Sequence, residues 1–182
     1  MTRVLHTYSD VRVEDQLETA TEMVKIGVHY PVKWQYCIED DDYWAFLLRN
    51  WGYEDIVIVE QDVVAKRHLV DGLVECPEHV CTYPYRLKAG QLSVFEITDG
   101  DTIPFIPQFY EVTPPLYTDG SGLGFIKISK ELQKHIPLHT YDVGLYKWWY
   151  LDSFISWHLK RLKYKIHVHQ HMVQHNRSIE DA

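Results

Sequence analysis

The stretch DIVIVEQD, residues 55–62, joins a continuous apolar run to a pair of acids. Unbroken apolar residues over 56–59 are typical of a strand covered on both faces, so we expect the central strand of a sheet here. Alternate residues of an extended chain point the same way, which would place the carboxylates of Glu60 and Asp62 on one side. Ligands bind at the carboxyl ends of strands in open α/β sheets, and paired carboxylates suit a divalent cation. Solvated surface acids are the alternative interpretation of this pair.

Strand and helix patterns alternate on both sides of this stretch. The predicted strands are residues 3–8, 33–38, 55–59, 80–83 and 92–97, with a strand-like segment at 164–173. The predicted helices are residues 13–27, 43–51 (with 40–42 as cap and first turn), 65–76 and 145–162, and regular patterning also marks 124–129 and 130–136. This alternation predicts a single-domain α/β fold with a Rossmann-like, mostly parallel or mixed central sheet flanked by helices.

Composition excludes several classes of protein. The chain has 182 residues, of which 46% are hydrophobic and 14% aromatic, enough for one core and unlike a disordered chain. The net charge of -8 argues against binding to nucleic acid. No charge-free stretch approaches the roughly 20 residues of a membrane span. Three cysteines without a CxxC pair, and no secretory signal at residues 1–9, indicate a reducing, cytoplasmic setting.

Residues 56–63, IVIVEQDV, resemble the Asp-x-Asp segment of glycosyltransferases with the GT-A fold. Residues 122–125, GLGF, followed by Ile128 and Ser129, look like that family's loop near donor sugar and acceptor, and 148–155 look like its acceptor-side helix bearing an acid. The resemblance spans about residues 3–175. It implies one glycosyltransferase-like domain over 1–182, with a nucleotide-binding half at about 1–75 and an acceptor-side half at about 77–182. Glu60 departs from the family's first Asp, and the short chain suggests a minimal, viral-type version.

The resemblance also implies a reaction and its participants. A sugar would move from a nucleotide-diphosphate donor, a UDP- or GDP-sugar, to a hydroxyl of a glycan, protein or small-molecule acceptor. Asp62 would bind Mn²⁺ or Mg²⁺ directly, Glu60 would contact ribose or metal, and Tyr8 would stack on the base at the end of the first strand. A core or rim position is the alternative for Tyr8. A viral version would act in the host cytoplasm.

Four histidines lie close together near the C-terminus: His167, His169, His171 and His175. An HxHxH pattern in extended chain directs three imidazoles to one face, so we expect one of this group, with His169 and His171 preferred, to complete the metal shell of Glu60 and Asp62. The alternative is the exposed face of an edge strand. The segment supplies no nearby cysteine and the acids favour hard oxygen coordination, so Mg²⁺ or Mn²⁺ is expected rather than zinc.

Asp152 borders an apolar stripe at helical spacing that includes Trp148, Leu151, Ile155, Leu159 and Leu162. A carboxylate there is costly unless it has a partner or a chemical role. In an inverting transferase that role is the general base that deprotonates the acceptor hydroxyl. An ion pair with Lys or Arg is the alternative, and Asp142 is the reserve candidate for the base.

Two rival functions stay open at this point. One is a metal-dependent hydrolase in which the histidines join Glu60 and Asp62 around an activated water. The other is a noncatalytic interaction protein that keeps the fold. The basic run Lys160, Arg161, Lys163 and Lys165 is either a solvated complement to a helix end or a contact for the diphosphate. No GxSxG, Walker or GxGxxG motif follows a predicted strand, which removes serine hydrolases, P-loop enzymes and dinucleotide oxidoreductases.

Overall fold

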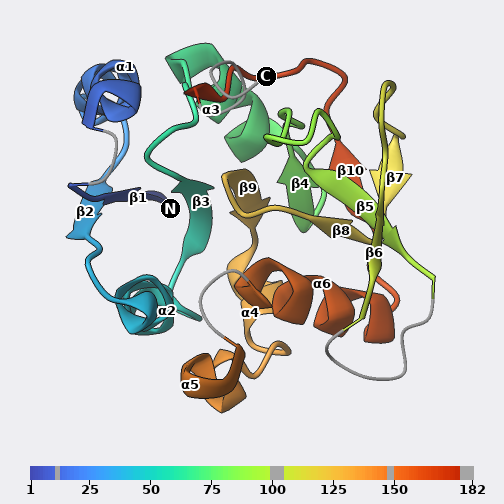
Figure 1. Cartoon of the computed structure of the whole chain (residues 1–182). Coiled ribbons are helices and arrows are strands. Elements are labelled where there is room, and N and C mark those ends of the chain that lie inside the picture. The colour runs from blue at the N-terminus through green and yellow to red at the C-terminus, as the bar shows by residue number, and fades with distance from the viewer. Residues whose placement is uncertain (11–12, 99–104, 147–149, 177–182) are drawn as a thin grey trace.

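A seven-stranded mixed sheet forms the middle layer of the molecule, with helices on both faces (Figure 1). The computed structural model describes residues 1–10, 13–98, 105–146 and 150–176. The strand order is β2-β1-β3-β9-β4-β10-β7, and a separate three-stranded sheet has the order β6-β5-β8. The predicted α/β fold with a mixed, Rossmann-like central sheet is therefore confirmed. The division into a nucleotide-binding half and an acceptor-side half stays a prediction.

The N-terminal part alternates strand and helix as the sequence pattern predicts. Its elements are β1 (Thr2–Tyr8), α1 (Val13–Ile26), β2 (Val32–Tyr36), α2 (Asp40–Asn50), β3 (Asp55–Val59) and α3 (Arg67–Glu75). β1 pairs in parallel with both β2 and β3. Each parallel connection runs through a helix, because parallel strands need a crossover of a dozen residues or more.

The C-terminal part completes the sheet with strands of both directions. Its strands are β4 (Val80–Thr82), β5 (Val94–Ile97), β6 (Pro107–Phe109), β7 (Tyr117–Thr118), β8 (Gly120–Ser121), β9 (Phe125–Ile128) and β10 (Ile166–Val168). Its helices are α4 (Lys130–Gln133), η1 (Leu138–Thr140), α5 (Val143–Tyr146) and α6 (Leu151–Arg161). β9 lies antiparallel between β3 and β4, and β10 is parallel to β4. The antiparallel pairings of β9 with β3 and β4, and of β7 with β10, make the sheet mixed.

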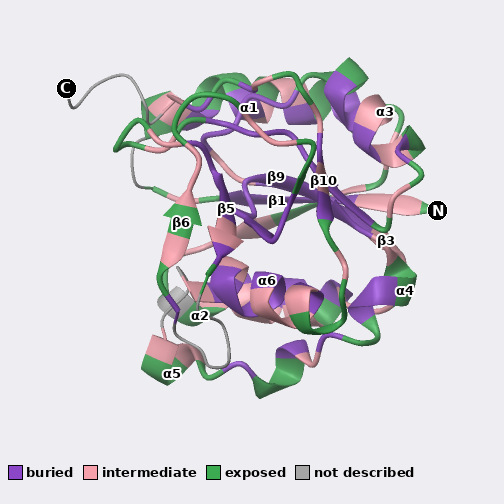
Figure 2. Cartoon of the chain, turned by 90° about the vertical axis from the view of Figure 1, so that its right-hand side faces the viewer, coloured by how far each residue is buried: buried purple, intermediate pink, exposed green. Residues whose placement is uncertain are grey.

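Side chains of β3 contribute to two hydrophobic cores, one on each face of the sheet. Ile56 and Ile58 pack into the core that α2, α4 and α6 cover, whereas Val57 and Val59 pack into the core under α1 and α3. All four side chains are fully buried, as the continuous apolar run predicts. Figure 2 shows the sheet as a buried layer between helices whose outer faces are exposed.

Three predicted elements differ in extent. The single long helix predicted over 145–162 is replaced by α5 and α6, and Trp148 lies outside the described residues. The strand-like segment predicted at 164–173 forms a strand only over Ile166–Val168. Its pairing with β4 ends with the hydrogen bond from the His169 N–H to the Thr82 carbonyl. The cap of α2 is Glu39 rather than one of the three following acids, and the Asp42 carboxylate accepts hydrogen bonds from the backbone N–H groups of Ile38 and Glu39. That capping box gives Asp42, the last acid of the run, a structural role.

Candidate active site

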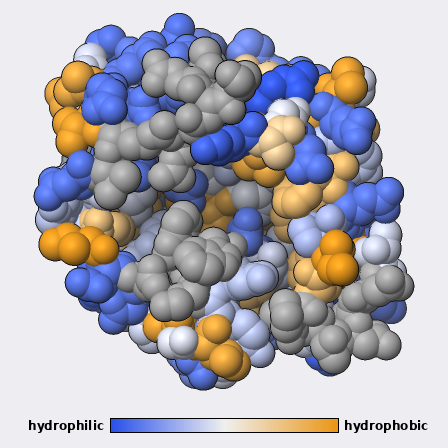
Figure 3. Space-filling view, viewed as in Figure 1, coloured by the Kyte–Doolittle hydropathy of each residue, from blue (hydrophilic) through white to orange (hydrophobic). Residues whose placement is uncertain are grey.

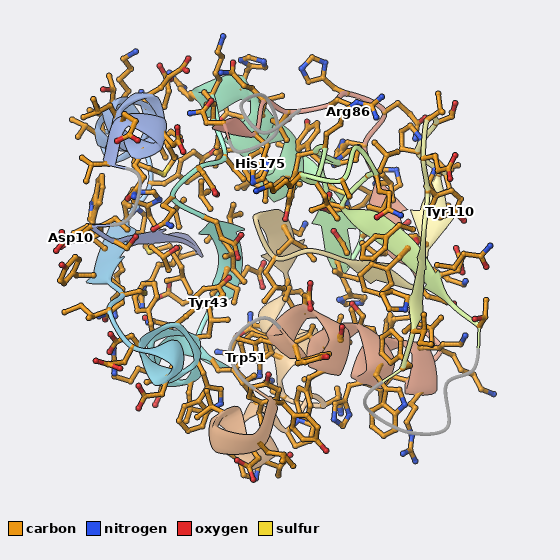
Figure 4. All side chains as sticks on the ribbon, in the orientation of Figure 1. Asp10, Tyr43, Trp51, Arg86, Tyr110 and His175 are labelled. Atoms are coloured by element: carbon orange, nitrogen blue, oxygen red, sulfur yellow. The ribbon has the colours of Figure 1, made fainter. Side chains whose placement is uncertain are left out.

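A pocket of about 520 Å³ opens at the carboxyl end of β3. Three carboxylic acids line it, and we call this set of Glu60, Asp62 and Asp152 the acidic triad. Its other lining residues are Tyr43, Tyr85, Leu87, Lys88, Ala89, Gln91, Ser93, Phe109, Gly122, Leu123 and His175. Figure 4 labels Tyr43 and His175 on either side of the region, and the surface in Figure 3 is hollowed near the centre of the same view. The volume lies within the usual range for small-molecule sites.

Glu60 follows the last residue of β3 and is held in place by its backbone. Its N–H donates a hydrogen bond to the carbonyl of Gly124, 2.9 Å away, which extends the pairing of β3 with β9 by one residue. Burial, then the negative charge of Asp62 and, to a smaller extent, that of Asp152 raise the pKa of Glu60 to about 7. The two acids therefore interact electrostatically, as expected from their spacing.

Asp62 lies against the C-terminal segment of the chain. Nε2 of His175 is 3.5 Å from Oδ2 of Asp62, and both side chains are largely buried. Nδ1 of His175 is 2.9 Å from the carbonyl oxygen of Arg86. Because a carbonyl only accepts, Nδ1 donates this hydrogen bond, which aims Nε2 at Asp62. The backbone N–H of Asn176 donates to the Asp62 carbonyl, 2.9 Å away, so backbone pairing fixes the position of both residues.

Asp152 reaches the pocket from the first turn of α6. Its Oδ1 accepts a hydrogen bond from the backbone N–H of Ser153 at 2.5 Å. Burial raises the pKa of Asp152 to about 6. In the part of the chain that the structure describes, Asp152 forms no salt bridge with Lys or Arg. Its neighbours Leu151 and Ile155 are buried in the core, as the apolar stripe predicts.

A pair of glycines and a tyrosine shape the pocket wall. The hydroxyl of Tyr85 accepts a hydrogen bond from the N–H of Gly124 at 3.1 Å. A Cβ atom at Gly122 would lie 2.5 Å from this hydroxyl oxygen, and one at Gly124 would lie 2.6 Å from it. Such distances are not compatible with the tyrosine in place, so the GLG sequence allows the loop to approach Tyr85. The glycines are visible as a motif in the sequence, whereas no sequence pattern marks Tyr85 as a pocket residue.

Tyr43 and Lys88 are further pocket residues that the sequence analysis missed. Tyr43 belongs to α2, and burial, followed by the negative charge of Glu60, raises the pKa of Tyr43 well above the usual value. Its buried hydroxyl has no hydrogen-bond partner among the described residues. Lys88 lies in a turn. The turn is closed by a hydrogen bond from the N–H of Leu87 to the carbonyl of Gln91, and Gly90 within it has a φ of +84°. Lys88 lines the same pocket as the three acids, but no local sequence pattern connects residue 88 to residue 60.

Several predicted site residues lie elsewhere. Tyr8 is 39% exposed at the end of β1, where its ring packs 5.4 Å from that of Tyr36, and it does not line the pocket. Asp142 is exposed and caps α5, where its Oδ1 accepts a hydrogen bond from the N–H of Leu145. Among the acids proposed as the general base, only Asp152 therefore lines the pocket.

The histidines divide into two groups. His175 lines the pocket, whereas His169 and His171 do not. The His169 ring stacks on Tyr83, with centroids 4.3 Å apart. The expectation that no cysteine lies nearby is wrong: Sγ of Cys76 is 3.4 Å from Nδ1 of His167. Cys76 ends α3 next to β10, a long-range contact that sequence spacing does not reveal.

The basic run at the end of α6 has structural partners. Lys160 and Lys165 form salt bridges with the buried Asp119, with N···O distances of 3.0 and 2.6 Å. Burial alone would raise the pKa of Asp119, but hydrogen bonds, first of all from Lys165, lower it to about 2. The guanidinium of Arg161 lies 4.6 Å from the Trp157 ring centroid. A diphosphate contact for Lys160 and Lys165 is therefore not supported.

The donor atoms of the acidic triad suit Mn²⁺ or Mg²⁺. Glu60 and Asp62 are carboxylates that repel one another in a desolvated site, and a divalent cation would remove that repulsion. Within the described ranges, the pocket provides no compact set of three protein ligands, since the one such group found lies at Cys76. This fits a hard cation that takes one or two carboxylates plus substrate phosphates rather than a closed protein cage.

Comparison with known proteins shows the fold. No family model and no curated protein matches the chain. Among solved structures, A197 from STIV is 16% identical with a TM-score of 0.54, over 93% of this chain and 81% of that one. A protein described as a glucose-1-phosphate thymidylyltransferase from Bacillus anthracis, in complex with sucrose, is 10% identical with a TM-score of 0.47, over 93% of this chain and 68% of that one. The first likeness supports a common fold, and the second is too low to carry an argument.

The helices of the described segments were also compared with the length and hydropathy of a membrane span. None of them is both long and apolar enough to cross a membrane.

Proposed function

We propose that this protein is a metal-dependent glycosyltransferase that moves a sugar from a nucleotide-diphosphate donor to an acceptor hydroxyl. One observation carries the proposal. The acidic pair that follows β3 and Asp152 of α6, distant in sequence, line the same pocket at the carboxyl edge of the sheet. The resemblance of residues 56–63 to the Asp-x-Asp segment of the GT-A glycosyltransferases supports the same reaction class.

Each acidic side chain has a separate role in the proposal. Asp62 holds Mn²⁺ or Mg²⁺, with Glu60 as a second ligand or a ribose contact, and the cation neutralises charge on the departing diphosphate. His175, rather than His169 or His171, is the histidine positioned to assist Asp62, because its Nε2 faces that carboxylate. A histidine that donates Nδ1–H to a backbone carbonyl keeps Nε2 directed at a ligand.

Asp152 is the proposed general base. Its carboxylate accepts the proton of the acceptor hydroxyl while the hydroxyl oxygen forms a bond to the anomeric carbon. The bond from that carbon to the diphosphate oxygen breaks, and the electron pair leaves with the diphosphate. A pKa of about 6 keeps most of the Asp152 carboxyl ionised at neutral pH and makes it a stronger base than an ordinary aspartate. Lys88, on the pocket lining, is placed to contact the negatively charged donor.

The rival hydrolase receives less support. It requires several histidines around the acidic pair, but only His175 of the four lines the pocket. A noncatalytic role predicts that metal and nucleotide are both inert, and the experiment below separates it from the proposal.

Thermal unfolding with Mn²⁺ and a panel of UDP- and GDP-sugars tests the function. A ligand at one hundred times its Kd stabilises the folded state by about 2.7 kcal/mol, which shifts the Tm by several degrees. We expect such a shift for wild type with Mn²⁺ plus the correct donor, and its loss in Asp62→Asn. Glu131→Gln, an exposed acid at the opposite edge of the sheet, is the matched control and keeps the shift. If no donor shifts wild type, the proposed function is wrong.

A further inference from the structure

Cys76, His167 and His169 form a compact group away from the acidic triad. One ligand atom of each lies within 4.8 Å of those of the other two, and in the described part of the chain this is the only such group of three. Sγ of Cys76 and Nδ1 of His167 are 3.4 Å apart. None of the three residues lines the pocket of the acidic triad.

Separate parts of the fold bring these side chains together. Cys76 is the C-cap of α3, His167 is the middle residue of β10, and His169 follows that strand directly. The backbone N–H of His169 donates to the carbonyl of Thr82, which continues the pairing of β10 with β4. Alternate residues of this extended segment thus place both imidazoles on one face beside the helix end.

One polar atom in this group is left without a partner. Nε2 of His169 is buried and has no hydrogen bond among the described residues, although the ring is fixed by stacking on Tyr83. Buried polar atoms nearly always have a hydrogen-bond partner, so an exception points to a bound water or ion. The ring of His167 is held by Tyr117, with centroids 5.5 Å apart.

We propose that Cys76, His167 and His169 bind a zinc ion as a second metal site, independent of the proposed glycosyl transfer. Thiolate and imidazole are the ligands that zinc prefers, and three protein ligands leave the fourth tetrahedral position to water or an added ligand. A second pocket, of about 460 Å³, is lined in part by Cys76, so one of the three residues borders a solvent-accessible cavity.

The ion would fasten the C-terminal segment to the body of the molecule. That segment continues from His169 to Val173, whose N–H donates to the Pro84 carbonyl, and on to His175 beside Asp62. Zinc would thus fix the position of the segment that leads to His175 in the proposed active site, without taking part in the reaction. Zinc should raise the stability of this segment by linkage, since the unfolded chain holds no preformed site.

One nearby charge opposes the ion. The ammonium of Lys127 is buried and donates to the carbonyl of Cys76 at 2.5 Å. A cation so close to the group lowers its affinity for another cation. We therefore expect Lys127→Met to bind zinc more tightly than wild type, provided that the variant folds.

Zinc and cobalt binding to the reduced full-length chain test the site. Zinc affinity is measured by competition with a chromophoric chelator. We expect one equivalent of zinc in wild type and affinity lower by at least about tenfold in Cys76→Ser, His167→Gln and His169→Gln. His171→Gln, which changes an exposed histidine two residues farther on, is the matched control and keeps the affinity, as does Asp62→Asn.

Cobalt binding to the wild-type protein reports on the sulfur ligand directly, so this test does not depend on whether any variant folds. A Co²⁺-loaded wild-type protein should show a thiolate-to-cobalt charge-transfer absorption that added zinc abolishes. Absence of that absorption in folded wild type, or equal zinc affinity in His169→Gln and His171→Gln, would overturn the zinc site. Either result leaves the glycosyltransferase proposal intact, because donor binding depends on Asp62 and not on Cys76.

Discussion

Glu60 and Asp152 are two carboxyl groups of one pocket whose protons are bound with different strength. Burial raises the pKa of both, but Glu60 also feels the charge of Asp62 and reaches about 7, whereas Asp152 reaches about 6. The carboxyl with a negatively charged neighbour, Glu60, benefits more from a cation, which leaves Asp152 to accept a proton.

Replacement of the proposed base tests the role of Asp152. We expect Asp152→Asn to lower kcat by about 10²- to 10⁴-fold, because general base catalysis contributes that much, while Mn²⁺ and donor affinity stay within about twofold. Steady-state turnover with the donor found by thermal shift measures kcat. Glu131→Gln should match wild type, and a kcat in Asp152→Asn close to that of wild type would contradict the assignment.

Metal binding should depend on the protonation of Glu60. Its carboxyl must lose a proton to bind a cation, so Mn²⁺ affinity should rise with pH up to and just beyond about 7 and then level off. Glu60→Gln should bind Mn²⁺ more weakly with a flatter profile over pH 6 to 8. Isothermal titration in two buffers of different ionisation enthalpy also reports the released proton. A wild-type affinity that is constant over this range would show that Glu60 is not linked to the metal.

At the scale of elements, local pattern predicts most of the first half of the chain. The strands and helices through β3 follow from apolar spacing and caps, and the buried run 56–59 is central as expected. The same reasoning fails where partners are distant. The antiparallel β9, the short β10 and the contact of Cys76 with His167 depend on pairings between segments far apart in sequence, which periodicity does not encode. For the same reason the sequence pattern does not reveal that His175 lies beside the acids, whereas His169 and His171 of the HxHxH pattern do not line the pocket.

The GLG loop gives an element-scale prediction. Gly124→Ala would place a Cβ 2.6 Å from the Tyr85 hydroxyl oxygen and force the ring or loop to move. We expect a loss of about 1–3 kcal/mol in the free energy of unfolding, the usual cost of overpacking, and weaker donor binding. Urea denaturation measures the loss in the free energy of unfolding. Gly144→Ala in α5, where the nearest atom is Oδ1 of Asp142 at 3.3 Å, should cost much less. If Gly124→Ala and Gly144→Ala lower the free energy of unfolding equally, the Tyr85 hydroxyl does not lie against Gly124 as the structure shows.

At the scale of the whole molecule, the acidic triad should reduce stability at neutral pH when no metal is bound. A carboxyl whose pKa is raised on folding contributes stability below its unfolded pKa and loses that contribution as pH rises through the folded value. For Glu60 this window runs from the ordinary glutamate pKa of 4.5 to its raised pKa of about 7. The buried His6 acts in the opposite sense, because burial lowers its pKa to about 4, so a comparison between variants isolates the carboxyl.

Glu60→Gln should therefore gain stability relative to wild type as pH rises from 5 to 7. The gain is at most about 1.4 kcal/mol per pH unit for one group and should disappear when saturating Mn²⁺ is present. Urea denaturation of both proteins at pH 5, 6, 7 and 8 measures it. A difference between the two proteins that does not change with pH would contradict the raised pKa of Glu60.

Coupling between cation and diphosphate tests the proposed site most directly. Calorimetric titration of UDP and of GDP into wild type and Asp62→Asn, each with and without Mn²⁺, gives the four affinities for each nucleotide. If Asp62 holds a cation that contacts the diphosphate, Mn²⁺ should tighten binding of one nucleotide to wild type by at least about tenfold, or about 1.4 kcal/mol, and should not do so in Asp62→Asn. Nucleotide affinities that are the same with and without Mn²⁺ in wild type, or an undiminished effect of Mn²⁺ in Asp62→Asn, would contradict a metal-dependent diphosphate site at the end of β3.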